Sequence, residues 1–154
     1  MHMVLCKSSK ELQIKIKEVK DMYLCLNCFE VYSNEYRYDR RDYNFCPKLG
    51  CDGEVVEIDE LMIPVIKTLN EKGYCTEYCC SGHYGDGYTN TYIKFSEWVE
   101  LPEELPDGFV YEERGNVIRK NYVDNLHPNE KYIEILNTTK DLIEWADNLP
   151  DEEY

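Results

Sequence analysis

The sequence lacks a long hydrophobic run. Its longest uninterrupted apolar stretch, from Leu61 to Ile66, has six residues, whereas a helix that crosses a membrane needs about 20. We therefore expect no membrane span. The start of the chain holds four consecutive apolar residues, Met3 to Cys6, before charged residues follow, so we also expect no signal peptide and a cytoplasmic protein.

Basic side chains are few: 17 lysines and arginines stand against 31 aspartates and glutamates, and the net charge is −14. Proteins that bind the phosphate backbone of DNA or RNA without sequence preference are normally basic, so this composition argues against such binding. A phosphate-binding Walker loop and a dinucleotide-binding glycine fingerprint are both missing from the sequence. These absences favour a binding protein over an enzyme.

Four of the eight cysteines form two close pairs, Cys25-Leu-Asn-Cys28 and Cys46-Pro-Lys-Leu-Gly-Cys51, which are separated by 17 residues. Two chain turns that each supply two thiolates are typical of a tetrahedral Zn²⁺ site. Because four thiolates fill the coordination sphere, we expect a structural zinc ion that takes no part in catalysis. The pattern resembles a zinc ribbon over residues 22–57.

Between the two cysteine pairs, arginines alternate with tyrosines, a composition that suits stacking on nucleic-acid bases. Acidic residues interrupt the same stretch and neutralise its charge, which favours a solvated hairpin over a nucleic-acid contact. The residues are Glu35, Tyr36, Arg37, Tyr38, Asp39, Arg40, Arg41, Asp42 and Tyr43. A ribbon can also dock other proteins, which would make the chain an interaction adaptor.

The remaining pattern predicts an α+β fold in which the zinc ribbon is followed by an amphipathic helix and a mostly antiparallel sheet with a C-terminal helix. Residues 10–19 alternate as a strand does, although a helix also fits their spacing. The amphipathic helix is predicted to begin near Asp59 and end near Gly73, with Pro64 disturbing its first turn. Its apolar positions are Ile58, Leu61, Met62, Val65, Ile66 and Leu69.

Strands are predicted where Tyr, Ile, Val and Thr are frequent. The last two strands form a hairpin around Gly115-Asn116, a pair that tolerates positive φ, and a surface loop over residues 98–108 precedes them. The four strands are residues 73–80, 91–95, 108–113 and 116–123. Residues 131–136 alternate weakly and predict a last strand, before a final helix capped by Thr138 or Thr139.

The charge distribution predicts two parts. Residues 1–51 carry nine basic and seven acidic side chains, whereas residues 52–154 carry eight and 24. We therefore expect an N-terminal strand with the zinc ribbon in residues 1–57, and an α+β ligand-binding domain in residues 58–154.

A second motif, with the letters CCSGH, ends a predicted strand and leads into a loop with three glycines. Their backbone N–H groups can converge on an anion, while serine and histidine side chains add donors. Tyrosines, which stack on flat ligands, are frequent near this turn. We therefore expect a phosphate-bearing or nucleotide-like small molecule at Thr76, Tyr78, Cys80, Ser81, Gly82, His83 and Tyr84.

The turn with Thr76, Cys80, Ser81 and Gly82, followed by a strand, resembles the Thr-x-x-x-Cys-Ser-Gly-Arg turn of the tRNA wybutosine-synthesis methyltransferase-like proteins, with His83 in place of the arginine. The resemblance implies a local fold and not the methyltransferase activity. The order of zinc ribbon, helix and CCSGH turn resembles small uncharacterised proteins of bacteria and their phages. That resemblance implies a phage accessory protein, for which sequestering a host nucleotide signal would be a natural use.

Three other interpretations of the turn stay open. Cys79 or Cys80 with His83, and with Cys75 or His127 as a distant partner, would make a second metal site, although alternation along a strand places Cys79 and Cys80 on opposite faces. Cys80 as nucleophile and His83 as base would make an enzyme acting on a nucleotide or tRNA-related substrate. The turn can also be purely structural, with its cysteines as small core residues.

Overall fold

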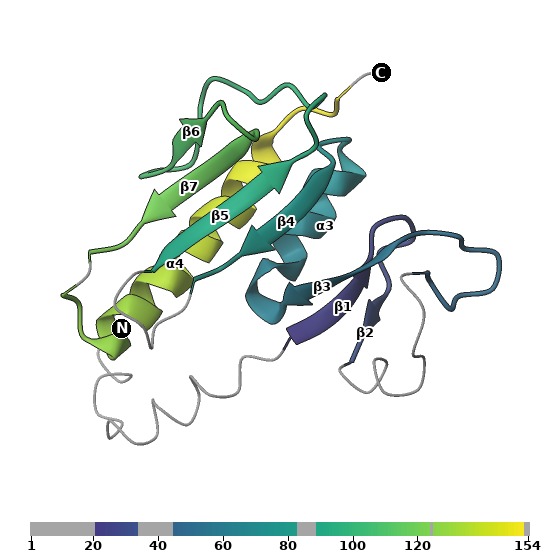
Figure 1. Cartoon of the computed structure of the whole chain (residues 1–154), viewed down its shortest axis with the longest axis horizontal. Helices are drawn as coiled ribbons and strands as arrows, with labels where there is room; N and C mark the ends of the chain where they lie inside the picture. Colours follow the sequence, from purple (N-terminus) through teal and green to yellow (C-terminus); the bar gives the residue numbers. More distant parts are fainter. Residues whose placement is uncertain (1–20, 34–44, 83–88, 124, 153–154) are drawn as a thin grey trace.

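The computed structural model of the chain describes residues 21–33, 45–82, 89–123 and 125–152, which are arranged as Figure 1 shows. This part has an α+β fold with two antiparallel sheets and two α-helices, the last one C-terminal. The elements are β1 (Asp21–Cys25), β2 (Val31–Tyr32), β3 (Val55–Asp59), the 3₁₀ turn η1 (Glu60–Met62), α3 (Ile63–Glu71), β4 (Thr76–Cys80), β5 (Asn90–Phe95), β6 (Val110–Glu112), β7 (Val117–Asn121) and α4 (Pro128–Asn148). The strand predicted at residues 10–19 lies outside the described residues.

The two sheets differ in size and in cover. Strands β2-β1-β3 form a three-stranded sheet, here called the cysteine sheet because the four predicted zinc ligands lie in it and in its turns. Strands β4-β5-β7-β6 form the four-stranded main sheet. Helices α3 and α4 lie behind the main sheet in Figure 1 and cover one of its faces. The other face, here called the open face, carries no helix among the described residues.

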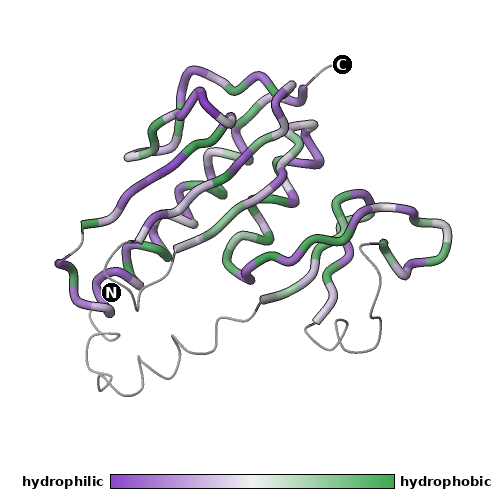
Figure 2. Tube along the Cα trace, in the orientation of Figure 1, coloured by the Kyte–Doolittle hydropathy of each residue, from purple (hydrophilic) through white to green (hydrophobic). Residues whose placement is uncertain are grey.

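Strand β5 shows how the sequence produces this layer. Its side chains alternate between half-buried and buried positions: Ile93 and Phe95 face the helices, and Tyr92 and Lys94 lie on the open face. This period of two is typical of a sheet with one covered face. Figure 2 shows hydrophobic and hydrophilic residues mixed along the helices and strands.

One hydrophobic core joins the two sheets. It contains side chains from α3, α4 and the main sheet, and it also includes Leu24 of β1 and Ile58 of β3. Both of these side chains are buried. The boundary predicted at residue 57 therefore runs through a shared core, and the division into two domains stays a prediction.

The helix predicted to begin near Asp59 opens with a 3₁₀ turn. Ile58 and Asp59 are the last two residues of β3, the 3₁₀ turn η1 follows, and the α-helix starts at Ile63. Pro64 lies in the first turn of α3, where a missing N–H costs little. The predicted cap at Asp59 and the predicted irregular first turn are confirmed. Ile58, the first position of the apolar pattern, belongs to a strand instead, because it satisfies the period of a strand as well as that of a helix.

The strands predicted after α3 are confirmed, three of them with shorter bounds and β5 with one more residue. β6 and β7 form the predicted antiparallel hairpin, with positive φ at Gly115 (+103°) and Asn116 (+54°). The Asn116 side chain donates to the carbonyl oxygens of Ser96 (2.8 Å) and Val99 (3.0 Å). The loop predicted at residues 98–108 contains no helix or strand, and these hydrogen bonds anchor its first part.

The C-terminal helix is longer than the sequence predicted. Residues 131–136, predicted as a last strand, belong to α4, and Thr138 and Thr139 lie inside the helix rather than at its start. Both threonines are buried, and Thr139 Oγ1 donates to the carbonyl oxygen of Ile135 (2.8 Å). The prediction was wrong because the weak alternation of residues 131–136 also fits a helix with one buried face.

Helix α4 begins instead with a capping box at His127. The ring Nδ1 of His127 accepts a hydrogen bond from the backbone N–H of Asn129 (3.2 Å), and the Glu130 carboxylate accepts one from the N–H of His127 (3.1 Å). Pro128 fills the first helical position. Histidine is not among the usual cap residues, which is why this start was missed.

Neither helix of the described residues combines the length and apolarity that crossing a bilayer requires.

The end of α4 is held by the end of α3. Lys72, the C-cap of α3, donates from Nζ to the carbonyl oxygens of Asp147 and Leu149 (2.6 Å each). A positive charge at the carboxyl end of a helix complements the helix dipole. The carbonyl oxygen of Lys72 in turn accepts a hydrogen bond from the N–H of Glu152 (2.8 Å), which fixes the tail after the helix.

Asp59 joins three elements through one carboxylate. It is the last residue of β3, and its Oδ1 accepts a hydrogen bond from the N–H of Met62 in the 3₁₀ turn (3.2 Å). Its Oδ2 accepts a hydrogen bond from the N–H of Ser81, directly after β4 (2.9 Å). The ends of β3 and β4 are therefore tied together where α3 begins.

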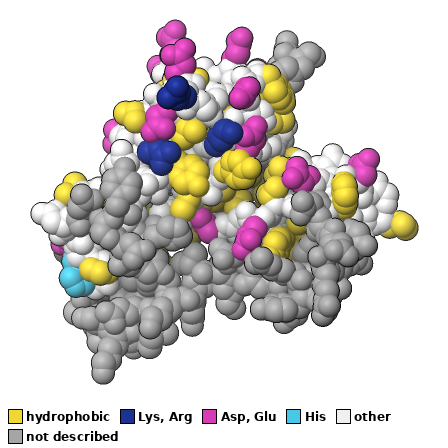
Figure 3. All heavy atoms as spheres, in the orientation of Figure 1, with side chains coloured by type: hydrophobic (Ala, Val, Ile, Leu, Met, Phe, Trp, Pro, Cys, Tyr) yellow, Lys and Arg dark blue, Asp and Glu magenta, His cyan; other side chains and the backbone are white. Residues whose placement is uncertain are grey.

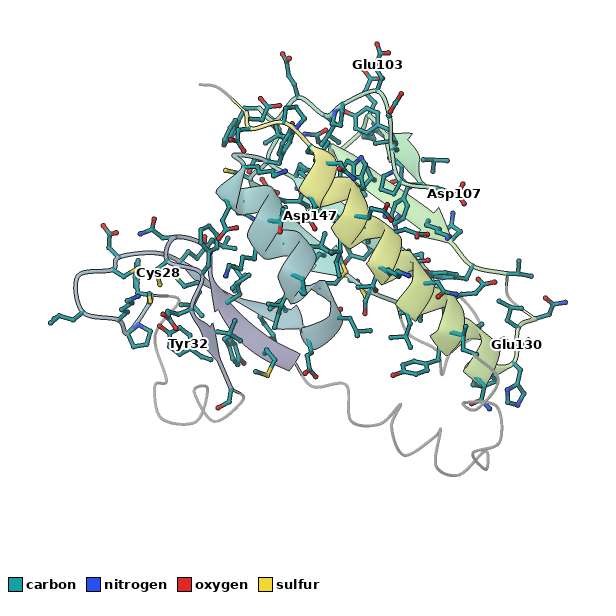
Figure 4. All side chains as sticks on the ribbon, turned by 180° about the vertical axis from the view of Figure 1, so that it is seen from behind. Cys28, Tyr32, Glu103, Asp107, Glu130 and Asp147 are labelled. Carbon is teal, nitrogen blue, oxygen red and sulfur yellow. The ribbon has the colours of Figure 1, made fainter. Side chains whose placement is uncertain are left out.

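Asp59→Ala removes both acceptors and leaves the N–H of Ser81, a buried residue, without this acceptor. We expect the free energy of unfolding to fall by about 2–3 kcal/mol, measured by urea denaturation of the metal-loaded protein. The control is Asp107→Ala, at an exposed loop position (Figure 4), which should cost less than about 0.5 kcal/mol. Equal stability of the two variants would contradict the role given to Asp59.

Candidate functional site

Four cysteine side chains converge beside the cysteine sheet. Cys25 ends β1, Cys28 follows in the turn to β2, and Cys46 and Cys51 lie in the turn before β3. Their sulfur atoms all lie within 4.8 Å of one another. They are the one group of three or more close metal-ligand side chains in the ranges that the structure describes. The predicted metal ligands are thus brought together.

The distances between the sulfur atoms fit a tetrahedral metal ion. Cys25 Sγ lies 3.7 Å from Cys51 Sγ, and Cys28 Sγ lies 3.6 Å from Cys46 Sγ. Four sulfurs about 2.3 Å from a central zinc ion stand about 3.8 Å apart. A disulfide would need about 2.05 Å. The arrangement therefore fits a metal such as zinc and excludes disulfides between these pairs.

Hydrogen-bond donors surround the sulfur atoms. The backbone N–H of Asn27 donates to Cys25 Sγ (3.4 Å) and its side-chain amide donates to Cys51 Sγ (3.6 Å). A hydrogen bond from the backbone of Gly53 lowers the pKa of the Cys51 thiol to about 7, which favours the thiolate that a metal binds. Position 53 needs glycine, because an added Cβ would lie 2.7 Å from Cys25 Sγ.

Tyr32 of β2 completes these surroundings. Its hydroxyl lies 3.1 Å from Cys46 Sγ and donates to that sulfur when Cys46 is a thiolate. Burial raises the pKa of Tyr32, so the hydroxyl keeps its proton for this bond. Figure 4 shows Tyr32 and Cys28 together at this end of the molecule. The sequence analysis missed both Asn27 and Tyr32, because neither is a residue type that binds zinc. The position of Asn27 between Cys25 and Cys28 was the one sequence signal that could have indicated its role.

Few other contacts hold this end of the cysteine sheet. Its local core consists of Cys25, Cys46 and Val55, with four partly buried side chains packed against them, and β2 has two residues. So small a core does not offset the entropy cost of ordering the chain. In such cases a metal bound to thiolates supplies the folding free energy. The centre therefore fits a structural metal.

The residues predicted to bind a ligand are spread over different environments. Thr76 is buried, and its N–H and hydroxyl are hydrogen-bonded to the Asn70 side chain (3.2 and 2.9 Å), so it fastens β4 to α3. Tyr78 lies on the open face with 66% of its surface exposed. His83 and Tyr84 lie outside the described residues.

Ser81 and Gly82, two further residues of the predicted ligand site, use their backbone N–H groups for hydrogen bonds within the fold. The N–H of Ser81 donates to the Asp59 carboxylate (2.9 Å), and the N–H of Gly82 donates to Cys80 Sγ (3.4 Å). Thr91 Oγ1 donates to the carbonyl oxygen of Ser81 (2.7 Å). A carboxylate beside Ser81 disfavours an anion at this end of the turn. The predicted anion site thus depends on residues after Gly82, outside the described part.

Cys79 and Cys80 face opposite sides of the main sheet, as alternation predicted. Cys79 pairs with Ile93 and packs against the core, whereas Cys80 pairs with Tyr92 on the open face. Burial raises the pKa of Cys79, and the Asp59 carboxylate adds to this shift. Burial thus favours the neutral thiol of Cys79 over the thiolate.

A cleft of about 740 Å³ lies between the two sheets. One wall is formed by residues 54–58 around β3, and the other by residues 75–79 around β4. The hydrogen bond between Ser81 and Asp59 closes one end. The volume is typical of ligand sites, which have about 300–1,000 Å³.

The cleft combines an apolar floor with aromatic and acidic side chains. Its floor includes Leu26 and Ile66, and its aromatic residues are Tyr78, Tyr92 and Trp98. Three carboxylates also line it, from Glu54, Glu57 and Glu77. The cleft was not predicted, because it forms between segments that lie apart in the sequence. Two of its lining residues, Thr76 and Tyr78, were predicted ligand residues.

Comparisons with protein-family models, with curated proteins and with solved structures found no match to this chain. The resemblances drawn from the cysteine pairs and from the CCSGH turn therefore stay predictions.

The metal centre predicts that substitution of a cysteine inside the group of four removes the metal, whereas substitution of a cysteine outside it does not. Cys46→Ser removes one of four thiolates, so we expect the metal content to fall from about one ion per chain to near zero, with a lower melting temperature. Mass spectrometry of the metal and thermal unfolding measure the two effects. Cys75→Ser, outside the group, should keep the metal. Retention of metal by the Cys46 variant would contradict the four-cysteine centre.

Tyr32→Phe tests the donor to Cys46 without removing a ligand. Loss of the hydroxyl should weaken metal binding by about tenfold, because partners of metal ligands tune the affinity. Competition with a chromogenic chelator measures this change. Tyr111→Phe removes a hydroxyl that donates to Asn116 instead (2.9 Å), so its metal affinity should stay that of the wild type. A Tyr32 variant with unchanged affinity would refute the contribution of this hydrogen bond.

Proposed function

We propose that the protein is a zinc-ribbon interaction adaptor, which binds a protein partner in the cleft between the ribbon and the main sheet. In this proposal the cysteine sheet is a zinc ribbon and its four thiolates hold a structural Zn²⁺. The ion supports the ribbon wall of the cleft and takes no part in chemistry, because four thiolates leave it no open position.

The observation that carries the proposal is the chemistry of the cleft. Two of its aromatic side chains are strongly exposed, Tyr78 (66%) and Trp98 (56%), although tyrosine and tryptophan usually bury most of their surface. These residue types dominate the energetics of protein interfaces. Glu54 and Glu57 on the ribbon side supply negative charge, which favours a partner with positive charge over a phosphate-bearing ligand.

A second candidate is the predicted nucleotide-like ligand, and one observation favours it. On the open face, Lys94 Nζ lies 5.7 Å from the ring centre of Tyr78, and Arg119 Cζ lies 5.0 Å from that of Tyr92. Hydrophobic and basic side chains stand together on this face in Figure 3. Such neighbours suit a flat ring with a phosphate. This candidate includes the predicted phage accessory protein that sequesters a host nucleotide signal.

The charges of the open face favour the adaptor. Lys94 forms an ion pair with Glu77 (2.6 Å), and Arg119 forms one with Glu112 (2.8 Å). A phosphate would have to displace or share these partners.

Selection of linear peptides from a random display library tests the adaptor. The selected peptides should bind the full-length, zinc-loaded protein, and the double variant Tyr78→Ala with Trp98→Ala should lose at least about tenfold in affinity. The control is Val110→Ala, an exposed position (56%) on the far edge strand β6. Peptides that bind the wild type and the double variant equally would reject the cleft as the interaction site.

Nucleoside monophosphates test the second candidate. They should raise the melting temperature of the wild type and not that of Tyr92→Ala if that candidate is correct. The adaptor predicts no shift for either protein.

A further inference from the structure

The cleft lies between two strand edges. β3 is the last strand of the cysteine sheet and β4 is the first strand of the main sheet, so each has one partner strand in the described sheets. Edge strands offer rows of N–H and C=O groups that pair with an added chain. The neighbouring edges of β3 and β4 thus border one cleft.

The direction of the backbone groups on β4 follows from its pairing. Phe95 of β5 directs its N–H to Asn116, away from β4, whereas Ser96 directs its N–H to Cys75 at the start of β4. Because backbone groups alternate along a strand, Lys94 and Tyr92 of β5 also face β4 and pair with Tyr78 and Cys80.

The residues between these pairs point the other way. Cys79 therefore directs its N–H and C=O away from β5, toward β3. The hydrogen bond of Ser81 confirms this alternation, because its N–H reaches the Asp59 carboxylate at the end of β3. Past that closed end, the edge of β4 faces the cleft with its backbone at Cys79.

The side chains of the cleft specify the charge of an added chain. Three carboxylates line it, from Glu54, Glu57 and Glu77, and no lysine, arginine or histidine is among its described lining residues. Of the three, Glu77 is paired with Lys94 (2.6 Å). The floor between them is apolar, with Val56 among its residues. The chain as a whole carries −14, which attracts a basic partner.

We infer that the cleft binds an extended basic peptide segment of the partner, which adds as a strand to the edge of β4. Alternate side chains of a strand point to opposite sides, so apolar residues of the segment face the floor while its lysines or arginines reach Glu57. Glu54 lies on the other side of β3 and adds attraction to the segment as a whole. The Thr76 N–H is already bonded to Asn70 (3.2 Å) and the register shifts between Thr76 and Tyr78, so the pairing centres on Cys79. This inference rests on the proposed adaptor function.

Defined peptides test the charge preference. A fluorescent peptide of about eight alternating valines and lysines is compared with its valine and glutamate counterpart, by fluorescence anisotropy with the full-length, zinc-loaded protein. The lysine peptide should bind at least about tenfold more tightly, and raising the salt from about 0.05 to about 0.5 M should reduce that preference. Equal binding of the two peptides overturns the inference.

Matched variants place the interaction. The double variant Glu54→Gln with Glu57→Gln should bind the lysine peptide about tenfold more weakly than the wild type. The control double variant Glu103→Gln with Glu104→Gln, in the acidic loop, should keep the wild-type affinity. In Figure 4, Glu103 lies at the top of the view, away from Cys28 at the left. Equal losses in both double variants would mean attraction to the overall charge and would overturn the site.

A third peptide tests strand addition. The lysine peptide with alternate N-methylated residues keeps its charges but loses backbone donors, so its binding should fall at least about tenfold. Unchanged binding overturns the pairing with β4. Peptides from the display library that still require Tyr78 and Trp98 would in that case leave the adaptor function standing.

The chain's own residues 10–19 have a similar alternation, with Ile14 and Ile16 beside Lys15 and Lys17. If the lysine peptide binds the full-length variant Lys15→Glu with Lys17→Glu and fails to bind the wild type, the cleft serves this segment and a partner peptide is overturned. Equal binding to both proteins supports the partner.

Discussion

The carboxylate of Asp59 is the contact on which the arrangement of the two sheets depends. One oxygen caps the turn that starts α3, and the other holds the end of β4 beside the end of β3. Charge-assisted hydrogen bonds of this kind are stronger than neutral ones. The shared core behind them, which includes Leu24 and Ile58, gives the same junction its apolar support. The position of the cleft follows, since its closed end is this hydrogen bond and its walls are the strands that meet there.

The two walls of the cleft are stabilised by different means. The main sheet has two helices on one face and a large apolar core, so hydrophobic burial holds it. The cysteine sheet has a local core of three buried residues and depends on its cysteine centre. Asn27 and Tyr32 donate to sulfur atoms there, so the surroundings of the centre are as specific as its ligands. In the proposed metal-loaded protein, a rigid wall therefore faces one whose order depends on the metal ion.

The sequence predicted the features that local chemistry decides. The spacing of Cys25, Cys28, Cys46 and Cys51 indicated the metal centre, and Gly115 with Asn116 indicated the hairpin, because each depends on a few adjacent residues. Residues 131–136 were assigned wrongly, since a short alternating run fits both periods and the deciding signal, the box at His127, uses an unusual cap. The Ser81 side chain was expected to help bind an anion. Only the fold reveals that a carboxylate lies beside this residue, since Asp59, 22 residues earlier, accepts a hydrogen bond from the Ser81 N–H.

In the proposed adaptor, a cleft with one metal-supported wall links two equilibria. An occupant that touches both walls binds the metal-loaded fold better than the metal-free chain, and thermodynamic reciprocity then requires it to tighten metal binding by the same factor. The partner and the ion would each slow the dissociation of the other or speed its association. Cells with scarce zinc would thus lose the complex before they lose the main sheet, and the protein's occupancy would follow metal supply.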